Sequence, residues 1–378
     1  MRIAFDAKRA YRNNSGLGNY SRDLVTAMVR QFSEDEYFLF SPQKATSGIA
    51  FPPEGLEVNE IGPEQPFDRM LPSVWRLKGM VKDLGRHKID LYHGLSHELP
   101  LGIGKTNIRK VVTMHDLIFK RFPEFYKAAD LRIYERKYKH ALQEADRIIA
   151  ISEQTREDLL RYYKLDPERI EVIYQGIHPS FFEEIPEESL QSYRKKEKLE
   201  GTFLLTVGAG NPRKNLSRLL EALKSFVPQA RPCLVVAARE NRYLKEIQRQ
   251  CKSLELDAWV QFKTDVPSKD LPKLYKAAAV TVIPSLFEGF GLPVGESLAC
   301  GTPVVTSKGT CFEEVGGEGA LYTDPLNPAE IAAAIQAVLT KRELRERLSA
   351  DGQAYVQRFA VQDHAFRVRE VYRDLVGS

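Results

Sequence analysis

Short apolar runs alternate with helix-like segments along almost the whole chain, which favours parallel sheets covered by helices. In the first half, strands are predicted at 2–7, 37–41, 56–61, 89–93, 110–114, 147–151 and 170–174. The alternation restarts at 203–208, with further strands predicted at 233–237, 260–263, 280–283, 304–307 and 320–323. A chain of 378 residues is long for one core. We therefore expect two doubly wound α/β domains with parallel sheets, rather than one oversized sheet.

A polar, charged segment separates the two halves and suggests where the domains meet. We predict a first domain over 1–180, a connection over 181–200 and a second domain over 201–355. The last residues, 356–378, are predicted to form a helix.

Composition excludes several classes of protein. The chain has 55 Lys and Arg against 51 Asp and Glu, a formal charge of +4 that is too mild to argue for a nucleic-acid partner. Its four cysteines form no C-x-x-C pair, which argues against structural zinc and a disulfide framework. No apolar stretch reaches membrane-spanning length, and the first residues read as a strand rather than a signal peptide. We expect a cytoplasmic protein.

Two glutamates eight positions apart, Glu288 and Glu296, frame the most informative stretch. The run 280–285 reads as a buried strand and 293–299 as the helix after it. Glu288 therefore follows the carboxyl end of a strand, where ligands bind in open parallel sheets, and the helix start offers backbone donors to an anion. Glu296 lies about two helical turns further on, so the pair could hold two parts of one elongated ligand. The alternative is a solvated helix face.

This stretch resembles the E-x7-E signature of the family-4 retaining glycosyltransferases, which use nucleotide-sugar donors. Members have the GT-B fold, in which two Rossmann-like domains face each other across a cleft. The dipeptide Pro284-Ser285 and the segment 301–305 also match the family. The resemblance implies that Glu288 lies by the donor sugar and that Glu296 binds ribose hydroxyls. It also implies that the C-terminal helix packs back on the first domain, the acceptor side.

Further donor contacts are expected around these glutamates. By the same resemblance, the backbone amides of Phe290, Gly291 and Leu292 hold sugar hydroxyls and phosphate; the alternative is a loop that only packs. Asp265 and Val266 follow another predicted strand, and we place them at the border of the nucleobase.

Two adjacent cations, Arg213 and Lys214, follow the strand at 203–208. Negative charge develops on a departing phosphate, so cations placed there favour the transition state. No D-x-D motif is present, and we therefore expect no metal and no other cofactor. The family places an Arg and a Lys in this loop. Its commonest pattern has an Arg at the position of Ala209, whereas 212–215 resembles a sub-pattern, so Lys214 is the safer of the two assignments. The alternative is a solvated pair at a helix start.

The first domain offers two more candidate positions. Gly16 and Gly18 lie between the first strand and the first helix, where glycine lets the backbone approach a ligand, although an ordinary flexible turn would look the same. The resemblance implies that this loop faces the donor phosphates and the acceptor.

His115 and Asp116 end the strand at 110–114 and match a His-Asp pair of the family. The histidine would bond the transferring sugar or back the reaction centre, unless it is only structural.

A basic amphipathic segment between 69 and 88 combines apolar side chains with Arg76, Lys78, Lys82 and Arg86. Such segments can lie on anionic lipid, which would suit a lipid-linked acceptor at the inner face of a membrane. The alternative is that the apolar side belongs to the core.

Together these features predict a retaining, metal-independent glycosyltransferase that moves a hexose from a nucleoside-diphosphate sugar to a glycan or lipid-linked hydroxyl. The sub-pattern at 212–215 occurs among mannosyltransferase-like members, which favours GDP-mannose as the donor. Two alternatives stay open, a nucleotide-sugar epimerase of the same fold and a non-catalytic nucleotide-binding assembly protein.

Overall fold

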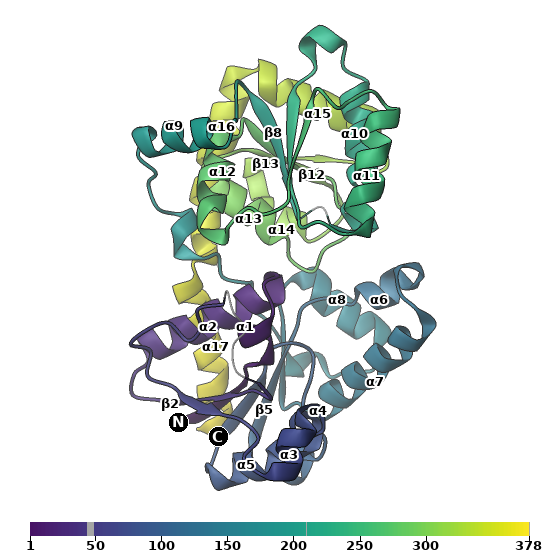
Figure 1. Ribbon diagram of the computed structural model, residues 1–378. Coiled ribbons are helices and arrows are strands. Elements are labelled where there is room, and N and C mark those ends of the chain that lie inside the picture. The colour runs from purple at the N-terminus through teal and green to yellow at the C-terminus, as the bar shows by residue number, and fades with distance from the viewer. Residues whose placement is uncertain (44–48, 209, 378) are drawn as a thin grey trace. The chain divides into compact units, whose positions relative to one another are not determined.

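The computed structural model describes residues 1–43, 49–208 and 210–377, and Figure 1 shows its helices and strands. The chain forms two compact units. Unit 1 contains Met1–Gly176 and Phe359–Ser378, and unit 2 contains Ile177–Arg358.

Unit 1 is built on a seven-stranded sheet in the order β3-β2-β1-β4-β5-β6-β7, in which every neighbouring pair is parallel. Its strands are β1 (Arg2–Asp6), β2 (Glu36–Phe40), β3 (Asn59–Ile61), β4 (Leu91–Gly94), β5 (Arg109–Met114), β6 (Arg147–Ala150) and β7 (Ile170–Val172). Helices cover both faces, so the central strands are buried on both sides and appear in the sequence as continuous apolar runs.

The helices of unit 1 are α1 (Lys8–Arg12), α2 (Gly16–Gln31), α3 (Pro66–Met70), α4 (Pro72–Val74), α5 (Met80–Arg86), α6 (Ile118–Arg121), α7 (Ala128–Glu144), α8 (Glu153–Tyr162) and α17 (Val361–Val376). A π-helical turn, η1 (Trp75–Gly79), joins α4 to α5, and 3₁₀ turns lie at Ile103–Lys105, Pro123–Phe125 and Pro167–Arg169. The three elements α4, η1 and α5 follow one another without a gap, so residues 72–86 of the basic segment form one continuous helical stretch with a π-helical turn in its middle.

The core of unit 1 has one layer on each face of the sheet. Ile3 and Phe5 of β1 point into the layer formed with α2 and α17, whereas Ala4 between them points into the layer formed with α5, α7 and α8. This is the alternation that a strand imposes on successive side chains.

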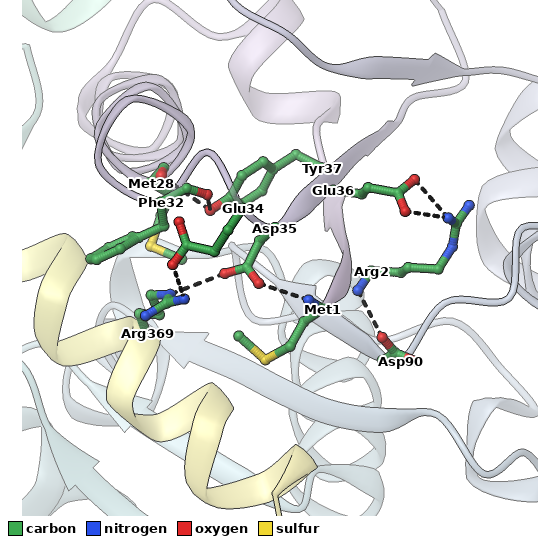
Figure 2. Close-up of polar contacts among 10 residues, drawn as sticks. All are labelled: Met1, Arg2, Met28, Phe32, Glu34, Asp35, Glu36, Tyr37, Asp90 and Arg369. Atoms are coloured by element: carbon green, nitrogen blue, oxygen red, sulfur yellow. Dashed lines mark hydrogen bonds and ion pairs between the residues drawn. The ribbon is translucent and has the colours of Figure 1, made fainter.

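The C-terminal helix α17 is part of the unit 1 core and contacts α2 and β5. Val368 and Tyr372 are buried in that core, and the Tyr372 hydroxyl hydrogen-bonds Nδ1 of His93. At the edge of the contact, Arg369 Nε donates to Asp35 Oδ2 at 3.0 Å, and its guanidinium lies 4.3 Å from the centroid of the Phe32 ring. Figure 2 shows this cluster.

Unit 2 has a six-stranded parallel sheet in the order β10-β9-β8-β11-β12-β13. Its strands are β8 (Phe203–Val207), β9 (Cys233–Ala237), β10 (Val260–Lys263), β11 (Val280–Ile283), β12 (Val304–Ser307) and β13 (Ala320–Thr323).

The helices of unit 2 are α9 (Glu187–Lys196), α10 (Leu216–Lys224), α11 (Arg242–Ser253), α12 (Leu271–Ala277), α13 (Leu292–Ala299), α14 (Phe312–Gly316), α15 (Pro328–Thr340) and α16 (Arg342–Val356). Further 3₁₀ turns lie at Pro179–Phe181, Pro212–Lys214, Pro228–Ala230, Ser268–Asp270, Gly317–Gly319 and Gln357–Phe359. Within the segment 181–200, expected from sequence as a connection, α9 packs against α12 of unit 2.

The order of strands in unit 2 decides which loops meet. β8 lies between β9 and β11, so successive strands are added first on one side of β8 and then on the other. Ligands bind in open parallel sheets where the order reverses in this way, beyond the carboxyl ends of the strands. The loop after β8 carries the candidate cations Arg213 and Lys214, and the loop after β11 carries Glu288.

Replacing Asp35 by Ala should weaken the docking of α17. The Asp35 side chain is only 3% exposed and pairs with both Arg369 and the amino group of Met1, so the change leaves two cations without this shielded partner and should cost about 1–3 kcal/mol in the free energy of unfolding. Urea unfolding of the purified chain measures this. Glu34→Ala is the matched control because Glu34 also pairs with Arg369 but is 61% exposed, and its loss should cost less than about 0.5 kcal/mol. Equal effects of the two changes would contradict this account.

Candidate functional site

The loops after β8 and β11 of unit 2 are joined by ion pairs. Arg213 Nη1 lies 2.7 Å from Glu288 Oε2, and Lys214 Nζ lies 2.5 Å from Glu288 Oε1. The three side chains are between 12% and 15% exposed, so the cluster is shielded but still reaches the surface. Arg213 Nη1 also donates to the Phe287 carbonyl, and the Leu286 amide donates to the Arg213 carbonyl at 2.8 Å. Residues predicted from separate motifs therefore form one cluster.

The backbone around these cations is held by Asn215, whose role the sequence did not reveal. Asn215 adopts a left-handed conformation with φ of 60°, which asparagine tolerates better than most residues. Its buried Nδ2 donates to the carbonyls of Pro284 at 3.0 Å and Pro325 at 2.6 Å. Asn215 thus fixes the end of the 212–215 motif to the end of β11. The only sequence signal that could have suggested this is the residue type itself, because asparagine is common in turns and tolerates the left-handed conformation.

The electrostatics of the cluster keep Glu288 ionised. Burial alone would raise the pKa of Glu288, but Lys214 and then Arg213 outweigh it and lower the pKa to about 2. At neutral pH the cluster therefore holds two cations and one carboxylate and keeps a net positive charge. The two cations of such a site can bind an anion. The carboxylate can at the same time accept hydrogen bonds from a neutral part of the same ligand.

Glu296 lies on α13, and its Oε2 accepts a hydrogen bond of 2.8 Å from the buried Tyr275 hydroxyl. Tyr275 comes from α12 and was not predicted from sequence.

Gly291, just before α13, has φ of +100°, and a Cβ there would lie 2.7 Å from the Phe312 ring. Glycine is therefore required at 291 by conformation and by packing, whatever its backbone amide binds. Phe290 is buried, and Leu292 begins the helix.

His115 and Asp116 follow β5 in unit 1. His115 is 4% exposed, its Nε2 donates to the Leu95 carbonyl at 2.9 Å, and its Nδ1 accepts from Gln175 Nε2 at 2.8 Å. Burial is the main cause that lowers the pKa of His115 to about 4, so the ring is neutral at physiological pH. Both ring nitrogens are therefore occupied, and a direct bond from His115 to a sugar would require one of these contacts to open.

Asp116 stabilises the loop after β5. Its Oδ1 accepts from the Ile118 amide at 3.0 Å, and its carbonyl accepts from the Tyr138 hydroxyl at 2.9 Å. These contacts hold the start of α6 in place, which is a structural role beside the predicted donor contact.

Comparisons with known proteins place the chain in a family. Residues 14–181 match the model for Glycosyltransferase Family 4, and residues 189–355 match that for Glycosyl transferases group 1. The chain belongs to the family-4 glycosyltransferases. The predicted family and enzyme class are thereby confirmed.

Individual relatives agree with this assignment. The glycosyltransferase is 29% identical over 292 residues to O-antigen chain mannosyltransferase B of Escherichia coli, covering 76% of this chain and 75% of the relative. It is 26% identical over 342 residues to O-antigen chain mannosyltransferase RfbU of Salmonella typhimurium, covering 87% and 89%. Among solved structures, Anabaena HepE in complex with UDP-glucose is similar with a TM-score of 0.77 and 22% identity over 99% of this chain and 100% of that one. This similarity to solved structures over nearly the whole chain confirms the predicted GT-B fold.

The other predicted residues of the glycosyltransferase come from elements other than the loops after β8 and β11. Asp265 is exposed and Val266 is half-buried, and both follow β10, an edge strand that β9 separates from β8. Gly16 and Gly18 lie in the first turn of α2 in unit 1. Ala209 is outside the described residues. The predicted set is thus divided between the two units.

Within residues 1–43, 49–208 and 210–377, no group of three or more His, Cys, Asp or Glu side chains is arranged to hold a metal ion. In the same ranges, no helix combines the length and apolar character needed to cross a bilayer.

The two glycines of the α2 turn should respond differently to alanine. A Cβ on Gly18 would lie 1.7 Å from the Asn13 carbonyl oxygen, whereas a Cβ on Gly16 would have no neighbour within 4 Å. Gly18→Ala should therefore lower the melting temperature of the glycosyltransferase by several degrees, because the loop before α2 must move; a loss of about 1 kcal/mol gives such a shift. Gly16→Ala should leave it unchanged. Differential scanning fluorimetry of both variants checks this, and a stable Gly18→Ala protein would contradict it.

Proposed function

We propose that this glycosyltransferase moves a hexose from a nucleoside-diphosphate sugar to a hydroxyl of a glycan or lipid-linked acceptor. The observation that carries the proposal is the shielded cluster of Arg213, Lys214 and Glu288 beyond the carboxyl ends of β8 and β11. The named activity of two relatives, mannosyl transfer to an O-antigen chain, and the UDP-glucose bound by HepE support this reaction class.

The cluster suits a leaving diphosphate. When the sugar departs, negative charge grows on the phosphate oxygens, and Arg213 and Lys214 are fixed cations that need no reorganisation to meet it. Because two cations are in place, the proposed reaction proceeds without a metal. A single preorganised donor of this kind is worth about 10²–10³ in kcat. Glu288 would then accept hydrogen bonds from hydroxyls of the transferring sugar.

Glu296 suits the ribose of the donor. A carboxylate can accept two hydrogen bonds from neighbouring hydroxyls, and the Tyr275 hydroxyl already occupies one acceptor site of Oε2. The start of α13 nearby supplies backbone donors for phosphate or sugar oxygens, as helix starts commonly do for anions.

We further propose GDP-mannose as the donor and retention of the anomeric configuration. The mannosyltransferase names of the relatives and the 212–215 motif support GDP-mannose, whereas the HepE complex makes a UDP-sugar the competing choice. Retention would follow from attack on the same face that the diphosphate leaves. An NMR spectrum of the product distinguishes an α from a β linkage.

Product analysis also separates the rival functions. Transfer releases GDP together with a glycosylated acceptor. Epimerisation gives an isomeric nucleotide-sugar without release of GDP, and a non-catalytic binding protein gives neither. Transfer that continues in excess EDTA would support the metal-free mechanism.

We also propose that the enzyme acts in the cytoplasm and contacts the membrane through the basic segment of unit 1. Trp75 is buried, but the opposite side of the same segment is apolar as well, and Met70 is 80% exposed. The large apolar side chains exposed there are Phe67, Met70, Leu71, Val74 and Leu77. The exposed cations beside them are Arg69, Lys78, Lys82 and Arg86. An apolar surface bordered by cations fits an anionic lipid surface, where each cation adds about 1 kcal/mol.

Substitutions in the ionic cluster test the catalytic proposal. Lys214→Ala should lower kcat with GDP-mannose by about 10²–10³, because a charge that meets the leaving group is lost. Glu288→Gln should also abolish most transfer, yet it should bind GDP at least as tightly as the wild type, because it removes a negative charge beside the two cations. Steady-state kinetics and a thermal-shift titration with GDP, UDP and ADP give the two readouts.

The matched control is Lys245→Ala, which removes a lysine of unit 2 that is 61% exposed and paired with Glu240. Its kinetics should equal those of the wild type. Near-normal turnover in both cluster variants would remove the site assignment.

Vesicle binding tests the membrane proposal. Met70→Glu places a charge on the exposed apolar surface and should reduce co-sedimentation with phosphatidylglycerol vesicles about tenfold, since an apolar contact worth more than 1.4 kcal/mol is lost. Binding should also fall with salt. Leu326→Glu is the control, because Leu326 is a 63% exposed apolar side chain of unit 2. Equal binding of the wild type to neutral phosphatidylcholine vesicles would contradict the proposal.

A further inference from the structure

The strand β10 forms one edge of the unit 2 sheet and pairs with β9. In this pairing the Leu234 amide donates to the Trp259 carbonyl at 2.7 Å. Backbone groups alternate in direction along a strand, so the amides and carbonyls of Val260 and Phe262 point away from β9. No described residue hydrogen-bonds these groups. The edge therefore offers backbone donors and acceptors to a further strand.

The features that usually protect such an edge are weak in β10. The strand contains no proline, and its lysine is held elsewhere. Lys263 Nζ lies 2.9 Å from Glu197 Oε2, also donates to the Glu197 carbonyl, and its side chain is only 11% exposed. The ammonium group is thus fixed against the end of α9 and does not shield the edge. Because β10 has four residues, it can pair with only a short extended segment.

A cavity of about 460 Å³ borders the outward-facing backbone groups. Val260 and Phe262 line it from β10, and Asp257 is the acidic residue in its lining. From α11 the cavity is lined by three exposed cations, Lys245, Arg249 and Lys252. We call this the basic cavity.

A second cavity, of about 340 Å³, adjoins the basic cavity at the amino ends of β8, β9 and β10, and both are lined by Asp257 and Val260. Val260 and Phe262 pack into the core layer that contains α11, so Gln261 between them points to the opposite face of the sheet. Gln261 lines the second cavity, which therefore reaches that opposite face. Its walls also include Leu199, Phe203, Cys233 and Trp259.

We propose that the β10 edge binds an extended segment of another protein in which acidic and apolar residues alternate. Added as a strand, the segment would hydrogen-bond the outward groups of Val260 and Phe262, and the cavities would select its side chains. Successive side chains of a strand point to opposite faces, so acidic ones can meet the basic cavity while apolar ones meet the rings of the second cavity. This binding site is independent of the proposed glycosyl transfer.

Charge decides between a foreign segment and a second copy of the chain. Lys245 pairs with Glu240, whereas Arg249 and Lys252 form no ion pair with a described residue. Edge-to-edge pairing of two copies about a two-fold axis would bring these cations close to their own counterparts, which disfavours a dimer. Carboxylates of a partner segment would instead neutralise them.

A short fluorescein-labelled peptide that alternates glutamate and valine tests the proposal by fluorescence anisotropy with the full chain. The same peptide with lysine in place of glutamate should bind about tenfold more weakly, because its charges repel the basic cavity. Two further versions carry N-methyl groups at alternate residues, one at the glutamates and one at the valines. Only residues that face β10 need their amide hydrogens, so one version should bind and the other should not.

Lys252→Glu should weaken binding of the glutamate peptide about tenfold, because a cation of the basic cavity becomes an anion. Its melting temperature and its stabilisation by GDP should stay as in the wild type, since Lys252 is exposed and lies outside the candidate donor site. Lys341→Glu is the matched control, because this exposed lysine precedes α16, and it should bind the peptide normally.

The proposal is overturned if the glutamate peptide does not bind at millimolar concentration, if both N-methylated versions bind alike, or if Lys252→Glu binds normally. A dimer in analytical ultracentrifugation that the peptide dissociates would identify a second copy as the occupant, which also overturns it. Peptide binding that depends on Lys252, in a chain that transfers no hexose, would reject the proposed function and keep this site.

Discussion

The parallel pairing of β8 with β11 is the constraint on which the candidate site depends. These strands are far apart in sequence, and their hydrogen-bonded register, Val280 with Leu204 and Thr281 with Leu205, brings their carboxyl ends to the same edge of the sheet. The loops that follow can then meet. Asn215 reinforces the arrangement by donating to Pro284, so the position of the cations is tied to the end of β11. A change in the strand order would separate Glu288 from Arg213 and Lys214 even if every local element still formed.

The ionic cluster balances two demands. Two cations held side by side repel each other, and Glu288 offsets this when no anion is bound. The same carboxylate stays ionised because the cations lower its pKa to about 2, against the effect of burial. A diphosphate would add negative charge to a site that is already positive overall, so the cluster can be stable when empty and still attract its ligand.

Unit 1 shows a different use of buried polar groups. His115 is satisfied at both ring nitrogens, and His93 is held by Tyr372 of the C-terminal helix and by Thr113, so these histidines contribute to a fixed interior. Ser96 and His97, in the loop after β4, in contrast keep buried side-chain atoms that no described residue hydrogen-bonds. Native proteins leave few such groups unsatisfied, so each one calls for a physical explanation.

The sequence by itself determined the doubly wound α/β class, the restart of the pattern near 203, the family, and the loops that carry Arg213, Lys214 and Glu288. These features are local, because strand and helix periodicity and loop chemistry are written within a few residues. The tertiary structure alone decided that Glu288 pairs with both cations, that Tyr275 bonds Glu296, that Gly18 is required by the Asn13 carbonyl, and that the helical stretch 72–86 contains the π-helical turn η1. Each of these depends on which segments the sheet order and the packing bring together, and neighbours in space that are distant in sequence leave no local pattern to read.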